Sequence, residues 1–561
     1  MKARSPHRPA ETPLTPRAGA SADAGAGSGT RMRAALLTFA TATFLTGATV
    51  GATAAFASPA SLRHALASFA GGAESAGLLY SVVFLPVADP GAPRPPIRDS
   101  DRAPGDTVRS HADLPLVPAS LAKLPTTAFA LEELGTDFTM NTRVLAKGEQ
   151  RGDTLRGDLV VMGGGDPFLV SERLWLLARD VRATGLTTVT GRLVIDSSWL
   201  TPDTLDPVRT SEREVSDRPY AAGLSALAVN FNAGAIRIQP GRQAGSPVMV
   251  EADPLPCAYL QIDTRLVTGT PESAEQLAVK LEPDGNGGEI AKIEGTLPAR
   301  APARVEYRSV SDPLAFSASM VRAFLTREGI VIAGPTAFEA APSEARLLVE
   351  FPSLQLRELV AKANRYSNNF MADQIALALS KRVGPAAKDS TARPAPTDLE
   401  ARDTLPDAVA LDSSSRAASL TEAGRWITAR LRETCGAPAN VRQLDGSGLH
   451  PGSRLTAETL ARLLAREWAD LRIGPDFAAS LAVPGQEGTL HGRFKDGPLP
   501  VMRGKTGTMS EPTASGIAGY LETSRGAIVA FAILMNAPAS TGWDLARMKS
   551  RQEMWVREFL R

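Results

Sequence analysis

Ser120 and Lys123 lie one helical turn apart in the segment PASLAKL, with apolar residues around both. In a helix, positions i and i+3 share a face, so the lysine amine can reach the serine hydroxyl. A serine needs a base to become a strong nucleophile, and a lysine becomes a base when desolvation or a neighbouring cation lowers its pKa. The spacing therefore predicts a nucleophile and its general base, although an N-cap serine beside a surface lysine would show the same pattern.

Ser367 and Asn369 form a second candidate pair, two residues apart in the stretch RYSNNFMAD. A turn there would point both side chains into one cleft, where a hydroxyl can relay a proton. The amide can bind a substrate carbonyl and hold a lysine. Helix surfaces often contain S-x-N, so this pair gains its meaning only from the other motifs.

A third candidate segment, RGKTGTMS, opens a predicted strand and contains Lys505, Thr506, Gly507 and Thr508. A lysine and two hydroxyls on one strand suit a substrate carboxylate, and a glycine permits close backbone approach. The N–H groups of Thr508 and Ser120 would form an oxyanion hole, which is worth about 3–4 kcal/mol per donor. An ordinary turn can also contain K-T-G.

The order S-x-x-K, S-x-N, K-T-G resembles the motif set of penicillin-binding proteins and class A β-lactamases. The chain resembles most the D-alanyl-D-alanine carboxypeptidase/endopeptidase family, serine peptidase family S13 (class C low-molecular-mass penicillin-binding proteins), over about residues 65–561. The gap of 247 residues between Ser120 and Ser367 fits this family, in which two extra domains are nested within the catalytic one, whereas the gap is short in β-lactamases. Further stretches that fit are GDLVVMGGGDP, LSALAVNFN, LDGSGL and VPGQEGTL, at residues 157–167, 224–232, 444–449 and 483–490.

The resemblance implies a serine-type D-alanyl-D-alanine carboxypeptidase/endopeptidase that acts on peptidoglycan stem peptides through an acyl-enzyme. It also implies covalent inhibition by β-lactam antibiotics and no metal or organic cofactor. The implied roles are nucleophile for Ser120, base for Lys123, proton relay for Ser367, orientation of substrate and lysine for Asn369, and substrate-carboxylate binding for the segment Lys505, Thr506, Gly507 and Thr508. A β-lactamase and a catalytically inactive cell-wall-binding protein are alternatives, and the residues do not rank carboxypeptidase against endopeptidase action.

The predicted fold class is α+β: a penicillin-binding-protein/β-lactamase-like transpeptidase domain, with an antiparallel sheet flanked by helices, and two nested β-rich inserted domains. Strand-like patterning begins near residue 138, and this pattern also predicts inserted domains independently of the family resemblance. The predicted organisation is a leader plus signal peptide at 1–57, the catalytic domain at 58–137 and 346–561 with a low-complexity insertion at 383–416, inserted domain II at 138–215 and 300–345, and inserted domain III at 216–299.

Local patterns predict the elements that must position the three motifs. Helices are expected over 120–134, ended by Gly135, and over 354–383; strands dominate from 138 to about 210. Three strands are expected at 501–509, 515–523 and 526–538, followed by a closing helix with Thr541 as its N-cap. Pro125 removes the N–H that would bond back to residue 121, so the first turn of its helix should be distorted.

The N-terminus and the charge distribution restrict where the protein acts. Arg31 and Arg33 precede a charge-free apolar run that ends in Ala-Phe-Ala, which reads as a secretory signal peptide cleaved after Ala57, with Met32 as an alternative start. This predicts secretion across the inner membrane to the periplasm or cell envelope. The formal net charge is +1 and no basic face is implied, so nucleic acid is not an expected partner. Oligomeric state is left open.

Cysteine and histidine usage indicates no metal site. Cys257 and Cys435 are the only cysteines, and either a disulfide or two free thiols fits the sequence. The five histidines are scattered without metal-ligand spacing.

Overall fold

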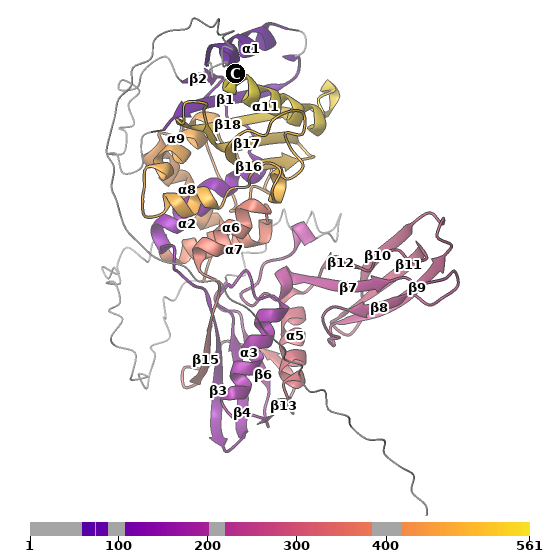
Figure 1. The fold of residues 1–561 in the computed structure, drawn as a ribbon. Coiled ribbons are helices and arrows are strands. Elements are labelled where there is room, and N and C mark those ends of the chain that lie inside the picture. The colour runs from indigo at the N-terminus through magenta and orange to yellow at the C-terminus, as the bar shows by residue number, and fades with distance from the viewer. Residues whose placement is uncertain (1–58, 73–74, 88–106, 201–218, 384–416) are drawn as a thin grey trace, which may run out of the picture. The chain divides into compact units, whose positions relative to one another are not determined.

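The computed structural model describes residues 59–72, 75–87, 107–200, 219–383 and 417–561 (Figure 1). The predicted leader and signal peptide, the alternative start at Met32 and almost all of the 383–416 insertion lie outside the described residues. The secondary structure is mixed α and β, with helices packed against an antiparallel sheet, as the α+β prediction requires.

A five-stranded antiparallel sheet joins the two ends of the described chain. Its order is β16-β17-β18-β1-β2, and Leu79 of β1 is paired with Asn536 of β18. Almost every residue of β18 is buried, because helices cover both faces of the sheet. The three predicted C-terminal strands are confirmed. The strands are β1 (Leu79–Pro86), β2 (Val108–Ser110), β16 (Met502–Met509), β17 (Thr513–Glu522) and β18 (Ile528–Ala537).

In the described part of the chain, helices pack against both faces of this sheet (Figure 1). The first face packs α1 (Pro59–Gly71) and α11 (Leu545–Leu560) through buried rings such as Trp555. The predicted N-cap of α11 is wrong: the carboxylate of Asp544, not Thr541, accepts from the N–H of Arg547 at 2.7 Å. The second face packs α2 (Lys123–Leu134), α6 (Leu356–Arg365), α7 (Asn369–Val383), α8 (Leu420–Cys435), α9 (Ala457–Trp468) and α10 (Gly474–Ala479).

Both helical segments that carry predicted site residues are interrupted next to those residues. Ser120 lies in a 3₁₀ turn, η3 (Ala119–Ala122), and the α-helix α2 begins only at Lys123. This confirms the distortion expected from Pro125. The helix expected over 354–383 is divided at Ser367, whose φ of 56° lies in the left-handed region. The division gives α7 a start at Asn369 and turns the S-x-N motif away from regular helix.

The region between α2 and α6 forms a separate seven-stranded sheet and two smaller sheets. The larger one has the order β13-β5-β4-β3-β15, with β6 pairing β4 and β14 pairing β6. Helix α3 (Ser171–Ala183) was not expected in this strand-rich region; Leu174, Leu177, Ala178 and Val181 supply its buried helical stripe. The strands are β3 (Asn141–Arg151), β4 (Thr154–Met162), β5 (Thr188–Val189), β6 (Leu193–Asp196), β13 (Val331–Ile332), β14 (Thr336–Phe338) and β15 (Arg346–Pro352), and α5 (Pro313–Arg327) packs with α3.

The two smaller sheets have three strands each, in the orders β12-β7-β8 and β10-β11-β9. They confirm that the inserted region is rich in strands. The residue boundaries predicted for domains II and III stay a prediction; strand pairing joins 304–309 to 233–239 and 346–352 to 141–151. The strands are β7 (Ala233–Gln239), β8 (Met249–Ala252), β9 (Leu260–Gly269), β10 (Gln276–Pro283), β11 (Glu289–Pro298) and β12 (Arg304–Ser309).

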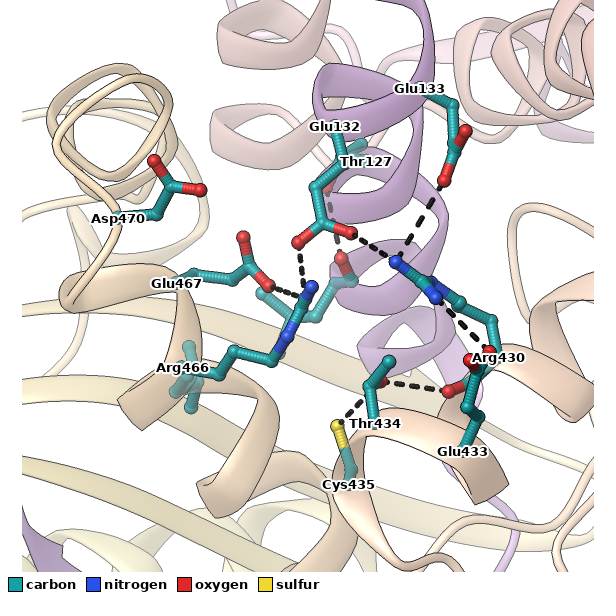
Figure 2. A network of polar contacts seen from close by, with 12 residues as sticks. Thr127, Glu132, Glu133, Arg430, Glu433, Thr434, Cys435, Arg466, Glu467 and Asp470 are labelled. Carbon is teal, nitrogen blue, oxygen red and sulfur yellow. Dashed lines mark hydrogen bonds and ion pairs between the residues drawn. The ribbon is translucent and has the colours of Figure 1, made fainter. Parts of the chain in front are cut away.

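A buried ionic network fixes the C-terminal end of α2 (Figure 2). The guanidinium of Arg466 pairs with the carboxylate of Glu132 and, at 2.6 Å, with that of Glu467. Arg430 adds a longer contact of 3.7 Å to Glu132. The side chains of Arg466, Glu132 and Glu467 are only 9%, 6% and 0% exposed, so their charges depend on one another for compensation. The network joins α2 to α8 and α9, and it holds the helix that carries Lys123 at its other end.

Replacing Arg466 by Met is expected to lower the free energy of unfolding by about 3–5 kcal/mol, because two buried carboxylates lose their shared cation. Urea denaturation measures the change. The matched control is Arg265→Met, which breaks a 3.7 Å pair with Glu294 whose side chains are 76% and 57% exposed. That control should stay within about 0.5 kcal/mol of wild type, and equal losses in the two variants would contradict the prediction.

Candidate active site

The amine of Lys123 is the point where three distant segments meet. Its Nζ donates to Ser120 Oγ at 2.9 Å and to Asn369 Oδ1 at 2.7 Å. A third bond of 2.7 Å goes to the backbone carbonyl of Ser447. Lys123 is completely buried, whereas Ser120 is partly exposed. The predicted serine–lysine contact therefore forms, and Ser120 keeps a side that faces solvent.

Three contacts of Lys123 bear on where the lone pair of its neutral amine can point. A neutral lysine amine has two N–H bonds and one lone pair, while carbonyl oxygens only accept hydrogen bonds. The two N–H bonds therefore belong to Asn369 Oδ1 and the Ser447 carbonyl. The lone pair is left facing Ser120 Oγ, the one partner of these three that has a proton to give. The arrangement suits deprotonation of the serine.

Lys505 lies in a second buried contact at the same site. Its Nζ donates to Ser367 Oγ at 2.8 Å and to the Thr506 carbonyl at 2.6 Å. Burial, and after it the positive charge of Lys123, hold the pKa of Lys505 well below its ordinary value. The predicted motif residues of all three segments thus come together around two amines.

The K-T-G strand lies directly against the turn that carries Ser120. A Cβ on Gly507 would lie 2.5 Å from the Pro118 carbonyl and 3.2 Å from the Leu121 nitrogen, so only glycine fits. Thr506 is buried, whereas Thr508 is exposed beside the site. The strand therefore exposes the side chain of Thr508 one residue after the glycine that lies against the turn of Ser120. The oxyanion hole from the N–H groups of Ser120 and Thr508 stays a prediction.

The backbone is strained on both sides of the site. Ala119 has a φ of 46° and Ser367 a φ of 56°, and residues with a Cβ rarely adopt this region. Such conformations persist where the surrounding structure enforces them, and they concentrate at functional sites. Here they turn the side chains of Ser120 and Ser367 out of their helices and toward the two lysines.

The contact from Ser447 was not predicted. Its segment, LDGSGL, was noted only as a stretch that fits the family, and a backbone carbonyl leaves no residue type to recognise. The signal that could have found it is the pair of glycines on either side. A Cβ on Gly446 would lie 2.6 Å from the Ala372 carbonyl, and one on Gly448 would lie 1.9 Å from the Ala119 carbonyl.

Among the described residues, no three His, Cys, Asp or Glu side chains gather where they could hold a metal ion. No helix in the same residues is long and apolar enough to cross a bilayer. Cys257 and Cys435 are both free thiols, and burial raises the pKa of Cys435 to about 11. Cys435 is therefore protonated and unreactive at neutral pH.

A serine that is hydrogen-bonded to a buried lysine, with a second buried lysine at the same site, set between a helical cluster and an antiparallel sheet, defines a serine acyl-enzyme hydrolase of the penicillin-binding class. A family model described as the D-Ala-D-Ala carboxypeptidase 3 (S13) family matches residues 105–395 and 397–557. The chain belongs to this family, and the predicted serine-type D-Ala-D-Ala carboxypeptidase/endopeptidase function is confirmed at that level.

Known relatives agree in sequence and in fold. The D-alanyl-D-alanine carboxypeptidase of Actinomadura sp. (strain R39) is 29% identical over 444 residues, which are 75% of this chain and 73% of that protein. The crystal structure of penicillin binding protein 4 from Haemophilus influenzae superimposes with a TM-score of 0.63 at 19% identity, covering 87% of this chain and 95% of that one. A structure of the same protein complexed with a β-lactam gives a TM-score of 0.59 at 20% identity with the same coverage. The predicted fold class is confirmed.

The lowered pKa of Lys505 makes a prediction about stability. Between the folded-state pKa and the ordinary value near 10.5, the unfolded chain binds a proton that the folded chain resists, so stability falls as the pH falls through this window. Replacing Lys505 by Met removes that loss. The free energy of unfolding of Lys505→Met relative to wild type should therefore rise as the pH is lowered.

Urea denaturation at about pH 10, 8 and 6 measures this difference. The control is Lys280→Met, because the side chain of Lys280 is 74% exposed. The control should show the same difference from wild type at each pH. A pH-independent difference for Lys505→Met would show that Lys505 holds its proton normally.

Proposed function

We propose that this chain cleaves the D-Ala-D-Ala ends or cross-links of peptidoglycan stem peptides through an acyl-enzyme on Ser120. The observation that carries the proposal is the triple contact of Lys123 Nζ, to Ser120 Oγ at 2.9 Å and to Asn369 Oδ1 and the Ser447 carbonyl at 2.7 Å each. When Asn369 Oδ1 and the Ser447 carbonyl accept the two N–H bonds of a neutral lysine amine, its lone pair faces Ser120 Oγ, the proposed nucleophile.

Acylation begins when Ser120 Oγ attacks the amide carbonyl and its proton passes to Lys123. The oxyanion that forms lies at the N–H groups of Ser120 and Thr508. Ser367, which is hydrogen-bonded to Lys505 Nζ at 2.8 Å, gives its proton to the leaving amine and regains one from protonated Lys123, so that Lys123 is neutral again before deacylation. The C–N bond then breaks, and the acyl group stays on Ser120 as an ester. Asn369 holds Lys123 and orients the substrate amide.

Deacylation reverses the proton transfers with water as the nucleophile. Lys123 takes a proton from water, the water oxygen attacks the ester carbonyl, and Ser120 recovers its proton as it leaves. Lys505, with the hydroxyls of Thr506 and Thr508, binds the terminal carboxylate of the substrate. A negative carboxylate beside Lys505 offsets the burial that lowers the pKa of that lysine, so substrate binding favours its protonated form.

The proposed setting is the cell envelope. The pattern of residues 31–57 supports export across the inner membrane. β-Lactam antibiotics are the expected covalent inhibitors, because they offer a strained amide with a carboxylate nearby. The Haemophilus influenzae protein that shares the fold has been solved with a β-lactam.

Labelled penicillin should form a covalent adduct with the wild-type protein and none with Ser120→Ala. Turnover of a D-Ala-D-Ala peptide should fall by a factor on the order of 10⁴ or more in that variant. The control is Ser198→Ala, which alters an exposed serine and should keep both activities. A wild type without an adduct, or an equal adduct on Ser120→Ala, rejects the proposal.

The lifetime of the penicillin adduct distinguishes the proposed peptidase from a β-lactamase. A β-lactamase would hydrolyse its adduct rapidly, whereas the adduct of the proposed peptidase should persist. Digestion of a linear pentapeptide and of a cross-linked dimer, followed by product analysis, tells carboxypeptidase from endopeptidase action. Absence of turnover with both substrates alongside a stable adduct would favour a cell-wall-binding protein.

Replacing Thr508 by Val should lower catalytic efficiency about tenfold for a peptide that ends in a free carboxylate, because a hydrogen bond to a charged group is lost. Thr508 is exposed, so the stability of the fold should change little. With the same peptide amidated at its C-terminus, the Thr508→Val substitution should lower catalytic efficiency much less than it does with the free acid. Equal losses on the two peptides would exclude Thr508 from carboxylate recognition.

A further inference from the structure

The loop Gln443–His450, here called the Asp445 loop, supplies the Ser447 carbonyl that binds Lys123. A carbonyl cannot be adjusted by a side-chain rotation, so the aim of this bond depends on how the loop itself is held. We propose that Asp445 is a positioning residue for the general base. It fixes the Ser447 carbonyl and thereby the direction of the Lys123 lone pair. The inference rests on the proposed function, in which Lys123 deprotonates Ser120.

The carboxylate of Asp445 organises the loop from inside. Its Oδ1 accepts from the N–H of Gly448 at 2.8 Å, and its Oδ2 accepts from the N–H of His450 at 2.8 Å. The hydroxyl of Ser447 adds a longer bond of 3.3 Å to Oδ2. Asp445 is 1% exposed, so water cannot replace these bonds. The carboxylate therefore closes a turn around Ser447 and leaves the carbonyl of that residue outside it.

The loop is also attached to the nucleophile's own turn. Gln443 Nε2 donates to the Ala122 carbonyl at 3.0 Å and to the Asp445 carbonyl at 2.9 Å. The close fit of Gly448 against the Ala119 carbonyl leaves no space for a Cβ. The loop thus contacts Ala119, which precedes Ser120, and Ala122, which precedes Lys123. A loop with these attachments moves with the serine–lysine pair as one unit.

The direction of the lone pair depends on this unit. If the Ser447 carbonyl shifts, one N–H of neutral Lys123 loses its fixed acceptor and can turn toward Ser120 Oγ. The lone pair then points away from the proton that it must accept, and proton transfer slows. Substrate binding at Thr506 and Thr508 does not use this contact, so the chemical step should change without the binding step.

The test is Asp445→Asn, which keeps the size of the side chain. One of the two N–H donors then faces an amide nitrogen instead of an oxygen, so half of the turn is lost. Asp196→Asn is a matched control: Asp196 is 1% exposed and accepts from the N–H groups of Ser198 and Ala341 at 2.7 and 2.8 Å, in the seven-stranded sheet. Both variants should melt at lower temperatures than wild type.

Rapid-mixing acylation by penicillin separates the non-covalent dissociation constant from the acylation rate. Asp445→Asn should lower the acylation rate about tenfold or more and leave the dissociation constant unchanged, while Asp196→Asn should change neither. A wild-type acylation rate in folded Asp445→Asn overturns the inference. So does an equal loss in the two variants, which would indicate a general effect of stability.

A milder variant, Ser447→Ala, keeps the carbonyl and removes the hydroxyl, with its bond to Asp445 and the 3.3 Å bond that it accepts from the Leu449 N–H. It should reduce the acylation rate by a smaller factor, about twofold to fivefold. If Asp445→Asn does not fold, this variant decides, and a wild-type rate contradicts the inference. A wild type that forms no adduct at all would refute the proposed function instead, so the two failures are distinguishable.

Discussion

Two completely buried lysines within one site form the constraint on which the structure depends. Lys123 and Lys505 are both 0% exposed, and burying an ammonium costs several kcal/mol. Each amine is held by fixed oxygens: a side-chain amide and a carbonyl for Lys123, and a hydroxyl and a carbonyl for Lys505. Burial, and after it the positive charge of Lys123, hold the pKa of Lys505 well below its ordinary value. Because burial disfavours the charged form of a lysine, it favours the neutral amine, which is the form that can accept a proton.

Close backbone contact keeps the amines at these distances. Gly507 brings β16 against the Pro118 carbonyl, and Gly516 of the neighbouring strand leaves only enough space for the Leu121 side chain. Gly448 brings the Asp445 loop against the Ala119 carbonyl from another direction. The turn of Ser120 is thereby fixed between a sheet and a loop, and its left-handed residue, Ala119, cannot relax. Rigid surroundings of this kind supply the preorganisation that acyl transfer needs.

The sequence predicted the side chains of the site and missed the backbone that holds them. Ser120, Lys123 and Lys505 have chemistry that can be read from residue type and spacing. The Ser447 carbonyl has no such signature, because every residue has a carbonyl. The break at Ser367 was hidden in a stretch with good helical periodicity, since the left-handed turn there is imposed by packing and not by a glycine. Helix α3 was missed because its neighbours are strands, although its own apolar spacing is helical.

Nesting explains how a gap of 247 residues leaves the site intact. The inserted region begins and ends side by side: Asn141 at the start of β3 is paired with Pro352 at the end of β15. The chain leaving α2 is also hydrogen-bonded to the chain entering α6, from Leu356 N–H to the Phe138 carbonyl at 2.9 Å. The two chain segments that connect the inserted sheets to α2 and α6 are therefore paired with each other. The inserted region then changes the distance between Ser120 and Ser367 no more than a hairpin turn would. Because closing a longer loop costs only slowly increasing entropy, large domains can be accepted here at little expense to the geometry of the site.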